Sequence, residues 1–219
     1  MSVFGSLQKT FVADFFRKLF RVTIINPENE PSEENAKSYV ACINHASAWD
    51  PIIIGACMHR PLRYMAKAEL FKIPLLGCLV KLFGAYPVKR DAADVLSVRT
   101  SINLLENGEV VGIYPEGHRA KKIPPSREVP LKNGAAMVAM RAKAGILPVT
   151  VITKGYKIRM FRKTIVVFGE YIPFEKLEEF AKDCGDIGNM DLYKKIMDKV
   201  YGEILENYKK YDTLNKKQK

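Results

Sequence analysis

The stretch from Ser38 to Pro51 reads SYVACINHASAWDP, and it predicts a strand, a tight loop and the start of a helix. Its first part, which ends at Asn44, is short and apolar, as a buried strand requires. Asp50 followed by Pro51 is typical of a helix start, because aspartate caps the first turn and proline fits the first helical position. The polar pair Asn44 and His45 therefore leaves the carboxyl end of a strand close to an acidic residue, where ligands bind in open α/β sheets.

Strand and helix signals alternate along the rest of the chain. Apolar and β-branched segments predict further strands at 21–26, 62–66, 85–88, 110–114, 147–152 and 164–168. Capped or amphipathic segments predict helices at 51–59, 74–83, 92–107, 133–144 and around 192–205. Such alternation implies β-α-β crossovers, so we expect a single α/β domain with a largely parallel mixed sheet covered by helices.

An amphipathic helix is predicted before this domain. Residues 3–20 place apolar side chains, five of them phenylalanine, at steps of three and four. This face can pack on the domain core or lie in a membrane interface, and the sequence leaves both interpretations open. We therefore divide the chain into a membrane-associating helix at 1–20, an α/β domain at 21–210 and a basic tail at 211–219.

Composition narrows the class of protein. The 219 residues are 47% hydrophobic and 27% charged, which excludes disordered and collagen-like classes. No uncharged apolar run is long enough to cross a membrane, and the first residues lack the pattern of a signal peptide. The four cysteines form no C-x-x-C pair, so we expect reduced thiols in a cytosolic protein.

The positive charge is unevenly spread. The formal net charge of +11 is concentrated at 1–25, 154–163 and 207–219. Such clusters favour an anionic partner, which on charge alone is nucleic acid, a phosphorylated substrate, an acidic carrier protein or a membrane surface.

His45 and Asp50 are the strongest candidates for catalysis. A carboxylate on one imidazole nitrogen fixes the tautomer and makes the other nitrogen a general base. The alternative is a capping aspartate beside an incidental histidine, and the spacing alone leaves it open. Ser47 and Cys42 are candidate nucleophiles in the same stretch, although neither has the context of a nucleophile elbow.

A second polar cluster follows a later predicted strand. Glu116, Gly117 and Arg119 combine an acid, a glycine and an arginine that can together hold a phosphate and orient a hydroxyl. Lys89 and Arg90 follow the preceding strand in the same way. Each signal is weak alone.

Together, in this order and spacing, these motifs resemble those of the glycerophospholipid acyltransferases, the lysophosphatidate (1-acyl-sn-glycerol-3-phosphate) acyltransferases in particular. The four matching blocks are N-H-x4-D at 44–50, a stretch from Lys67 to Arg90, Y-P-E-G-x-R at 114–119 and an apolar-proline strand at 146–149. The resemblance covers about residues 20–170, and its first and third blocks are the most specific.

The resemblance implies a role for each matching residue. His45 is expected to be the general base, with Asp50 orienting it. The expected glycerol-phosphate site comprises Arg90, Lys89, Glu116, Gly117 and Arg119, and Pro148 is expected to shape the acyl-chain region. His118 and Ala120 stand where the family commonly has a threonine and a serine, which leaves the headgroup of the acceptor open.

The implied reaction moves a fatty acyl group from acyl-CoA or acyl carrier protein to the free sn-2 hydroxyl of 1-acyl-sn-glycerol-3-phosphate, which makes phosphatidic acid. No metal or other cofactor is needed, because the acyl thioester is the co-substrate. We expect a cytoplasmic enzyme, peripheral on the inner face of the cell membrane, that contacts anionic lipid and no nucleic acid. The alternatives are the same chemistry on glycerol-3-phosphate or another lysophospholipid, and a non-catalytic basic module that binds membrane or nucleic acid.

Overall fold

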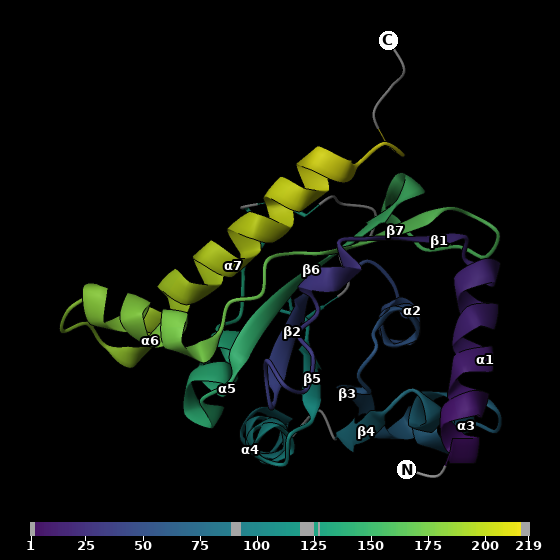
Figure 1. The fold of residues 1–219 in the computed structure, drawn as a ribbon, viewed down its shortest axis with the longest axis horizontal. Coiled ribbons are helices and arrows are strands. Elements are labelled where there is room, and N and C mark those ends of the chain that lie inside the picture. The colour runs from purple at the N-terminus through teal and green to yellow at the C-terminus, as the bar shows by residue number, and fades with distance from the viewer. Residues whose placement is uncertain (1–2, 89–92, 119–124, 127, 216–219) are drawn as a thin grey trace.

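The computed structural model describes residues 3–88, 93–118, 125–126 and 128–215, and its centre is a seven-stranded sheet (Figure 1). The strands are β1 (Val22–Ile25), β2 (Tyr39–Ile43), β3 (Leu62–Lys67), β4 (Ala85–Val88), β5 (Val110–Ile113), β6 (Gly145–Thr153) and β7 (Thr164–Phe168). Their order across the sheet is β1-β7-β6-β2-β5-β3-β4. Neighbouring strands are parallel except β6 and β7, which are antiparallel, and this mostly parallel mixed sheet confirms the predicted fold class.

Helices cover both faces of the sheet (Figure 1). One face carries α1 (Val3–Leu19), α2 (Asp50–Cys57) and α3 (Leu76–Leu82). The other carries α4 (Ala93–Glu106), α5 (Gly134–Ala142), α6 (Phe174–Asp183) and α7 (Asn189–Tyr211). In β2, Tyr39, Ala41 and Ile43 join the first apolar cluster while Val40 and Cys42 join the second. Successive side chains of a strand point to opposite faces, so one apolar strand builds both layers of the core.

The direction of the strands determines where the motifs meet. β2 through β6 run in the same direction, so their carboxyl ends lie at one edge of the sheet. β2 and β5 are neighbours, which brings the loop after β2 beside the turn after β5. We call this side of the sheet the carboxyl edge.

The N-terminal helix α1 packs on the domain through one face. Phe16 in α1 and Phe20 directly after it are buried, and the ring centroid of Phe20 lies 5.3 Å from that of Trp49. Phe11 and Phe15 face outward and are 78% and 56% exposed. The inner face of α1 therefore packs on the core, whereas Phe11 and Phe15 on its outer face are exposed. No helix within the described ranges is long and apolar enough to cross a bilayer.

Two details differ from the sequence prediction. α6 was not predicted, although Phe174, Leu177 and Phe180 follow one another at steps of three among charged residues, and Leu177 is buried. α2 begins at Asp50 with Trp49 in the N-cap position, so the helix starts one residue earlier than expected. Asp50 then lies in the first turn, where the helix dipole still favours a negative charge.

Candidate active site

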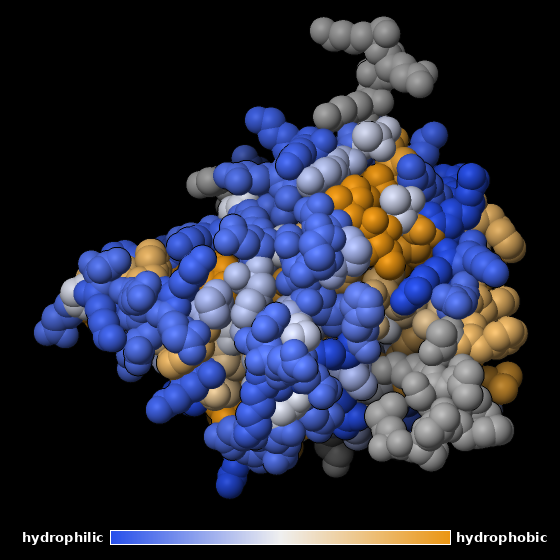
Figure 2. Space-filling view, viewed as in Figure 1, coloured by the Kyte–Doolittle hydropathy of each residue, from blue (hydrophilic) through white to orange (hydrophobic). Residues whose placement is uncertain are grey.

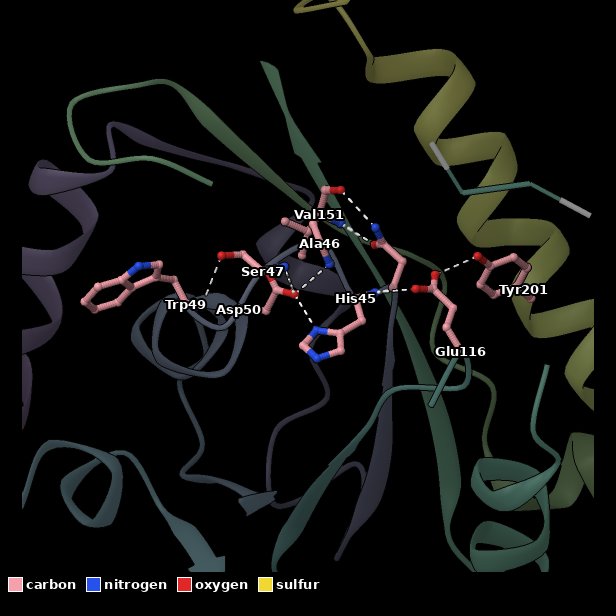
Figure 3. Close-up of polar contacts among 9 residues, drawn as sticks. His45, Ala46, Ser47, Trp49, Asp50, Glu116, Val151 and Tyr201 are labelled. Atoms are coloured by element: carbon pink, nitrogen blue, oxygen red, sulfur yellow. Dashed lines mark hydrogen bonds and ion pairs between the residues drawn. The ribbon is translucent and has the colours of Figure 1, made fainter. Parts of the chain in front are cut away.

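The structure brings His45 and Asp50 into contact at the carboxyl edge (Figure 3). Nδ1 of His45 lies 2.7 Å from Oδ2 of Asp50. The same oxygen accepts hydrogen bonds from the backbone N–H groups of Ala46 at 2.7 Å and Ser47 at 2.8 Å. A carboxylate oxygen surrounded by donors assigns the imidazole proton to Nδ1, which leaves Nε2 as a proton acceptor. Nε2 points away from Asp50 in Figure 3, and the His45 side chain is 18% exposed.

Asp50 itself is completely buried. Burial raises the pKa of Asp50, while the hydrogen bond and charge of His45 and the two backbone hydrogen bonds lower it. A buried carboxylate that is paired in this way stabilises an imidazolium that forms beside it. The pair thus has the geometry of an oriented general base.

Two further side chains hold the loop that carries the base. The amide of Asn44 donates to the carbonyl of Val151 at 3.1 Å and accepts from its N–H at 2.7 Å. On the other side, the carboxylate of Glu116 accepts the backbone N–H of His45 at 3.1 Å and the hydroxyl of Tyr201 at 2.7 Å. The loop is therefore tied both to β6 and to the turn after β5 (Figure 3).

Glu116 lies differently from what its expected phosphate-site role requires. Its side chain is almost completely buried, and each carboxylate oxygen accepts a hydrogen bond from the protein. Burial raises the pKa of Glu116, whereas the hydrogen bonds from Tyr201 and from the His45 N–H lower it. This placement suits a residue that positions the loop, because a carboxylate beside a phosphate would repel it. Tyr201 was not among the residues predicted for the site, since a tyrosine within the apolar stripe of a helix gives no separate signal.

Gly117 makes the turn after β5. Its N–H donates to the carbonyl of Tyr114 at 3.0 Å, and its φ of +68° is a conformation that favours glycine. The side chain of Lys132 covers this turn, because a Cβ on Gly117 would lie 2.7 Å from its Cε. Lys132 also donates its backbone N–H to the carbonyl of Pro115 at 2.7 Å. The neighbouring His118 is exposed.

A cavity of about 330 Å³ opens beside the base. The ring of Tyr114 packs against His45 with centroids 4.3 Å apart and forms part of the wall. Two exposed cations, Lys67 and Lys132, also line it, and neither was singled out as a site residue from the sequence. Much of the remaining wall is apolar and includes Met65, Ala66, Val98, Ile113 and Val138.

The other expected site residues fall into two groups. Lys89, Arg90 and Arg119 lie outside the described residues, as does Ala120 of the third motif. Pro148 is buried in the middle of β6, and the structure does not bring it to the cavity wall among the described residues.

The two candidate nucleophiles are poorly placed for attack. Cys42 is fully buried in β2, and burial together with the charge of Glu116 raises the pKa of its thiol. The hydroxyl of Ser47 accepts the N–H of Trp49 at 3.3 Å. Neither arrangement activates a side-chain nucleophile.

Known proteins are similar to this chain in sequence and in fold. The family described as Acyltransferase matches residues 21–152. A 1-acyl-sn-glycerol-3-phosphate acyltransferase of Bacillus subtilis (strain 168) is 37% identical over 128 residues, which are 58% of this chain and 60% of that protein. The protein of the same name from Streptococcus pneumoniae is 30% identical over 127 residues, 57% of this chain and 45% of that protein. The matched region therefore spans about half the length of these relatives.

A solved structure supports the fold over most of the chain. The crystal structure of the 1-acyl-sn-glycerophosphate (LPA) acyltransferase, PlsC, from Thermotoga maritima superposes with a TM-score of 0.63 at 22% identity, covering 92% of this chain and 81% of that one. The family match contains His45, Asp50 and Glu116 and extends over more than half of the residues. The chain belongs to the acyltransferase family.

Proposed function

We propose that the protein transfers a fatty acyl group from an acyl thioester to the free sn-2 hydroxyl of 1-acyl-sn-glycerol-3-phosphate, which yields phosphatidic acid. The observation that carries this proposal is the contact between His45 and the buried Asp50 beside a largely apolar cavity. The names of the matching proteins from Bacillus subtilis and Streptococcus pneumoniae support the choice of acceptor.

His45 acts as the general base. Nε2 takes the proton of the acceptor hydroxyl while that oxygen attacks the carbonyl carbon of the thioester. The tetrahedral intermediate then collapses, the carbon–sulfur bond breaks, and the sulfur leaves as a thiol that takes the proton from Nε2. Asp50 keeps the imidazole in the required tautomer and stabilises the transient imidazolium. A positioned base of this kind contributes on the order of 10²–10⁴ to the rate.

The transfer is direct, without an acyl-enzyme intermediate. Cys42 is buried with a raised pKa, which disfavours the reactive thiolate. The hydroxyl oxygen of Ser47 accepts the N–H of Trp49, and among the described residues it has no hydrogen bond to the imidazole. The base therefore activates the acceptor itself.

The apolar wall of the cavity and the cations that line it bind different parts of the substrate. The apolar wall suits an acyl chain, and the exposed ammonium groups of Lys67 and Lys132 suit the phosphate of the acceptor. We propose that Lys89, Arg90 and Arg119 add to this phosphate site.

A panel of acceptors tests the substrate class. Wild-type protein is assayed with acyl-CoA or acyl carrier protein as donor, and with lysophosphatidate, glycerol-3-phosphate or lysophosphatidylcholine as acceptor. We expect the highest kcat/KM for lysophosphatidate, because it offers both an acyl chain and a phosphate monoester. A preference for glycerol-3-phosphate would shift the conclusion to that acceptor, and transfer to none of them would contradict the proposed activity.

Lys132 allows a sharper test of phosphate binding. Lys132→Ala removes one ammonium group from the cavity, so we expect the KM for lysophosphatidate to rise about tenfold while the KM for the donor stays within about twofold. Lys195→Ala, an exposed lysine of α7, is the matched control. Equal changes in both KM values would argue against a phosphate contact.

We further propose that the protein rests peripherally on an anionic membrane, on the inner face of the cell membrane. The outer face of α1 exposes Phe11 and Phe15, and Figure 2 shows hydrophobic side chains along the edge of the molecule where α1 lies. The loop at 157–163 joins this surface, since the N–H of Phe161 donates to the carbonyl of Leu19 at 2.7 Å and its ring is 72% exposed. The loop connects β6 to β7 and therefore lies at the carboxyl edge of the sheet, the edge that also carries the base.

Vesicle sedimentation tests this contact. We expect wild type to bind vesicles containing phosphatidylglycerol more tightly than pure phosphatidylcholine, because basic residues of the loop contribute about 1 kcal/mol each near an anionic surface. The pair Phe11→Ser and Phe15→Ser should weaken binding at least tenfold, since each buried phenylalanine is worth about 1.5–3 kcal/mol. Val95→Ser, an exposed apolar residue of α4 on the other helical layer, is the control. Equal losses in both variants would contradict the assignment of this surface.

The non-catalytic alternative explains less of the structure. A basic module that binds nucleic acid accounts for the net charge of +11 but not for a buried carboxylate paired with a histidine. Salt-sensitive DNA binding without acyl transfer would favour that alternative.

A further inference from the structure

We propose that Tyr201, on helix α7, is a positioning residue for the catalytic histidine and acts through Glu116. The inference rests on the proposed function, because it assigns a role within the same reaction. It adds to the site a residue that lies beyond the family match, which ends at residue 152.

The three residues form a continuous chain of hydrogen bonds (Figure 3). The hydroxyl of Tyr201 donates to Oε1 of Glu116 at 2.7 Å, and Oε2 accepts the backbone N–H of His45 at 3.1 Å. Tyr201 and Glu116 are each 2% exposed, so water has little access to either carboxylate oxygen. Each oxygen therefore depends on its protein donor.

The direction of the first hydrogen bond is fixed by chemistry. Burial and the neighbouring carboxylate both raise the pKa of Tyr201, so the phenol stays protonated and donates. Burial raises the pKa of Glu116, and the hydrogen bond from Tyr201 is the largest of the influences that lower it. The hydroxyl thus favours the ionised carboxylate, and an ionised carboxylate is the stronger acceptor for the His45 N–H.

The charged and titratable neighbours of Glu116 come from several elements. Asp50 at the start of α2 disfavours its negative charge, whereas His45 favours it. Cys42 lies beneath in β2 with a raised pKa and stays neutral. Tyr201 is accordingly the contact from α7 that balances the cost of burying a second carboxylate close to Asp50.

The consequence is a link between the C-terminal helix and the position of the base. Side chains that position a base shape the barrier more than substrate affinity, because a displaced base loses alignment with the reacting hydroxyl. Tyr201 is buried and is not among the described residues that line the cavity, so we expect it not to touch a substrate bound there.

The test compares Tyr201→Phe with Tyr208→Phe. Tyr208 is on the same helix, is also buried, and its hydroxyl has no hydrogen-bond partner in the described part of the chain. We expect Tyr201→Phe to lower kcat roughly tenfold while both KM values stay within about twofold. We expect Tyr208→Phe to match wild type. Both variants keep the aromatic ring, and rates are referred to folded protein.

An NMR measurement separates this inference from the proposed activity. The amide proton of His45 should shift upfield in Tyr201→Phe, because its hydrogen bond to Glu116 weakens, and should stay in place in Tyr208→Phe. If wild type transfers no acyl group, the proposed function fails while the amide signal still decides the link.

A double-mutant cycle with Glu116→Gln tests the route of the effect. If Tyr201 acts through Glu116, Tyr201→Phe should change kcat less than twofold in the Glu116→Gln background. Independent, multiplying effects would overturn the proposal. So would an unchanged His45 amide in Tyr201→Phe, or a loss of stability with kcat unchanged.

Discussion

Replacing Asp50 by asparagine separates the charge of the catalytic pair from its shape. The amide oxygen can still take the position of Oδ2 and accept the donors of His45, Ala46 and Ser47. The amide nitrogen then takes the position of Oδ1, which is buried without a hydrogen-bond partner among the described residues. The variant keeps the hydrogen-bond geometry at one oxygen and loses the negative charge.

The expected magnitude follows from the missing attraction. For charges about 4 Å apart at an effective dielectric constant of about 20, a carboxylate and an imidazolium attract by about 4 kcal/mol. A barrier increase of about 1.4 kcal/mol slows a reaction tenfold, so the full loss corresponds to a factor of about 10³. We expect Asp50→Asn to lower kcat by about 10²–10³, because the retained amide oxygen preserves part of the orientation.

The assay is thiol release from acyl-CoA at saturating lysophosphatidate, with urea unfolding measured in parallel. Glu30→Gln is the matched control, since Glu30 is also a buried carboxylate that accepts several hydrogen bonds but lies before β2, at the opposite edge of the sheet. That variant should lose stability and keep kcat. A loss of less than tenfold in a folded Asp50→Asn protein, or an equal loss of kcat in Glu30→Gln, would refute the reasoning.

Three further predictions concern stability, each measured by urea unfolding. Gly117→Ala should lower the free energy of unfolding by about 1–2 kcal/mol, because alanine is strained at a φ of +68° and its methyl meets Lys132; an unchanged value would contradict that geometry. Gly202 lies in α7, and a Cβ added there would meet no neighbouring atom, so Gly202→Ala should raise the free energy of unfolding by about 0.5–1 kcal/mol. A decrease would count against the helix there. Burial raises the pKa of Glu116 above its ordinary 4.5, so the folded state binds this proton more tightly than the unfolded chain, and this group makes stability fall as pH rises from 4.5 through the raised pKa. Glu116→Gln should flatten that decline, and an identical pH profile would show that the carboxylate is not held as described.

The parts of the fold that could be predicted are those with local signals. The apolar run before Asn44 predicted β2 to within one residue at each end, and the Asp50-Pro51 helix start predicted α2 to within two. Strand order and the reversed direction of β7 could not be derived, since the pairing of β1 with β7 joins residues more than a hundred positions apart. Such contacts depend on the packing of the whole chain and do not affect the local periodicity of hydrophobic residues.

The candidate site divides in the same way. The contact between His45 and Asp50 could be predicted, because both lie in one short loop between a strand and a helix. The contact between Glu116 and Tyr201 joins residues 85 positions apart, and nothing in α7 distinguishes this tyrosine from a core residue. A sequence motif also names residue types without their orientation, and so Glu116 was expected at the phosphate and is found beneath the loop.

The most direct test of the central claim follows an isotopically labelled acyl group from acyl-CoA into phosphatidic acid by mass spectrometry. Wild type, His45→Ala and His59→Ala are compared at equal folded concentration with lysophosphatidate as acceptor. His59 is a suitable control, because its ring is 76% exposed and it precedes β3, away from the carboxyl edge. We predict labelled product from wild type and His59→Ala at similar rates, and a rate at least 10² lower from His45→Ala. Labelled phosphatidic acid formed by His45→Ala at nearly the wild-type rate would contradict the account.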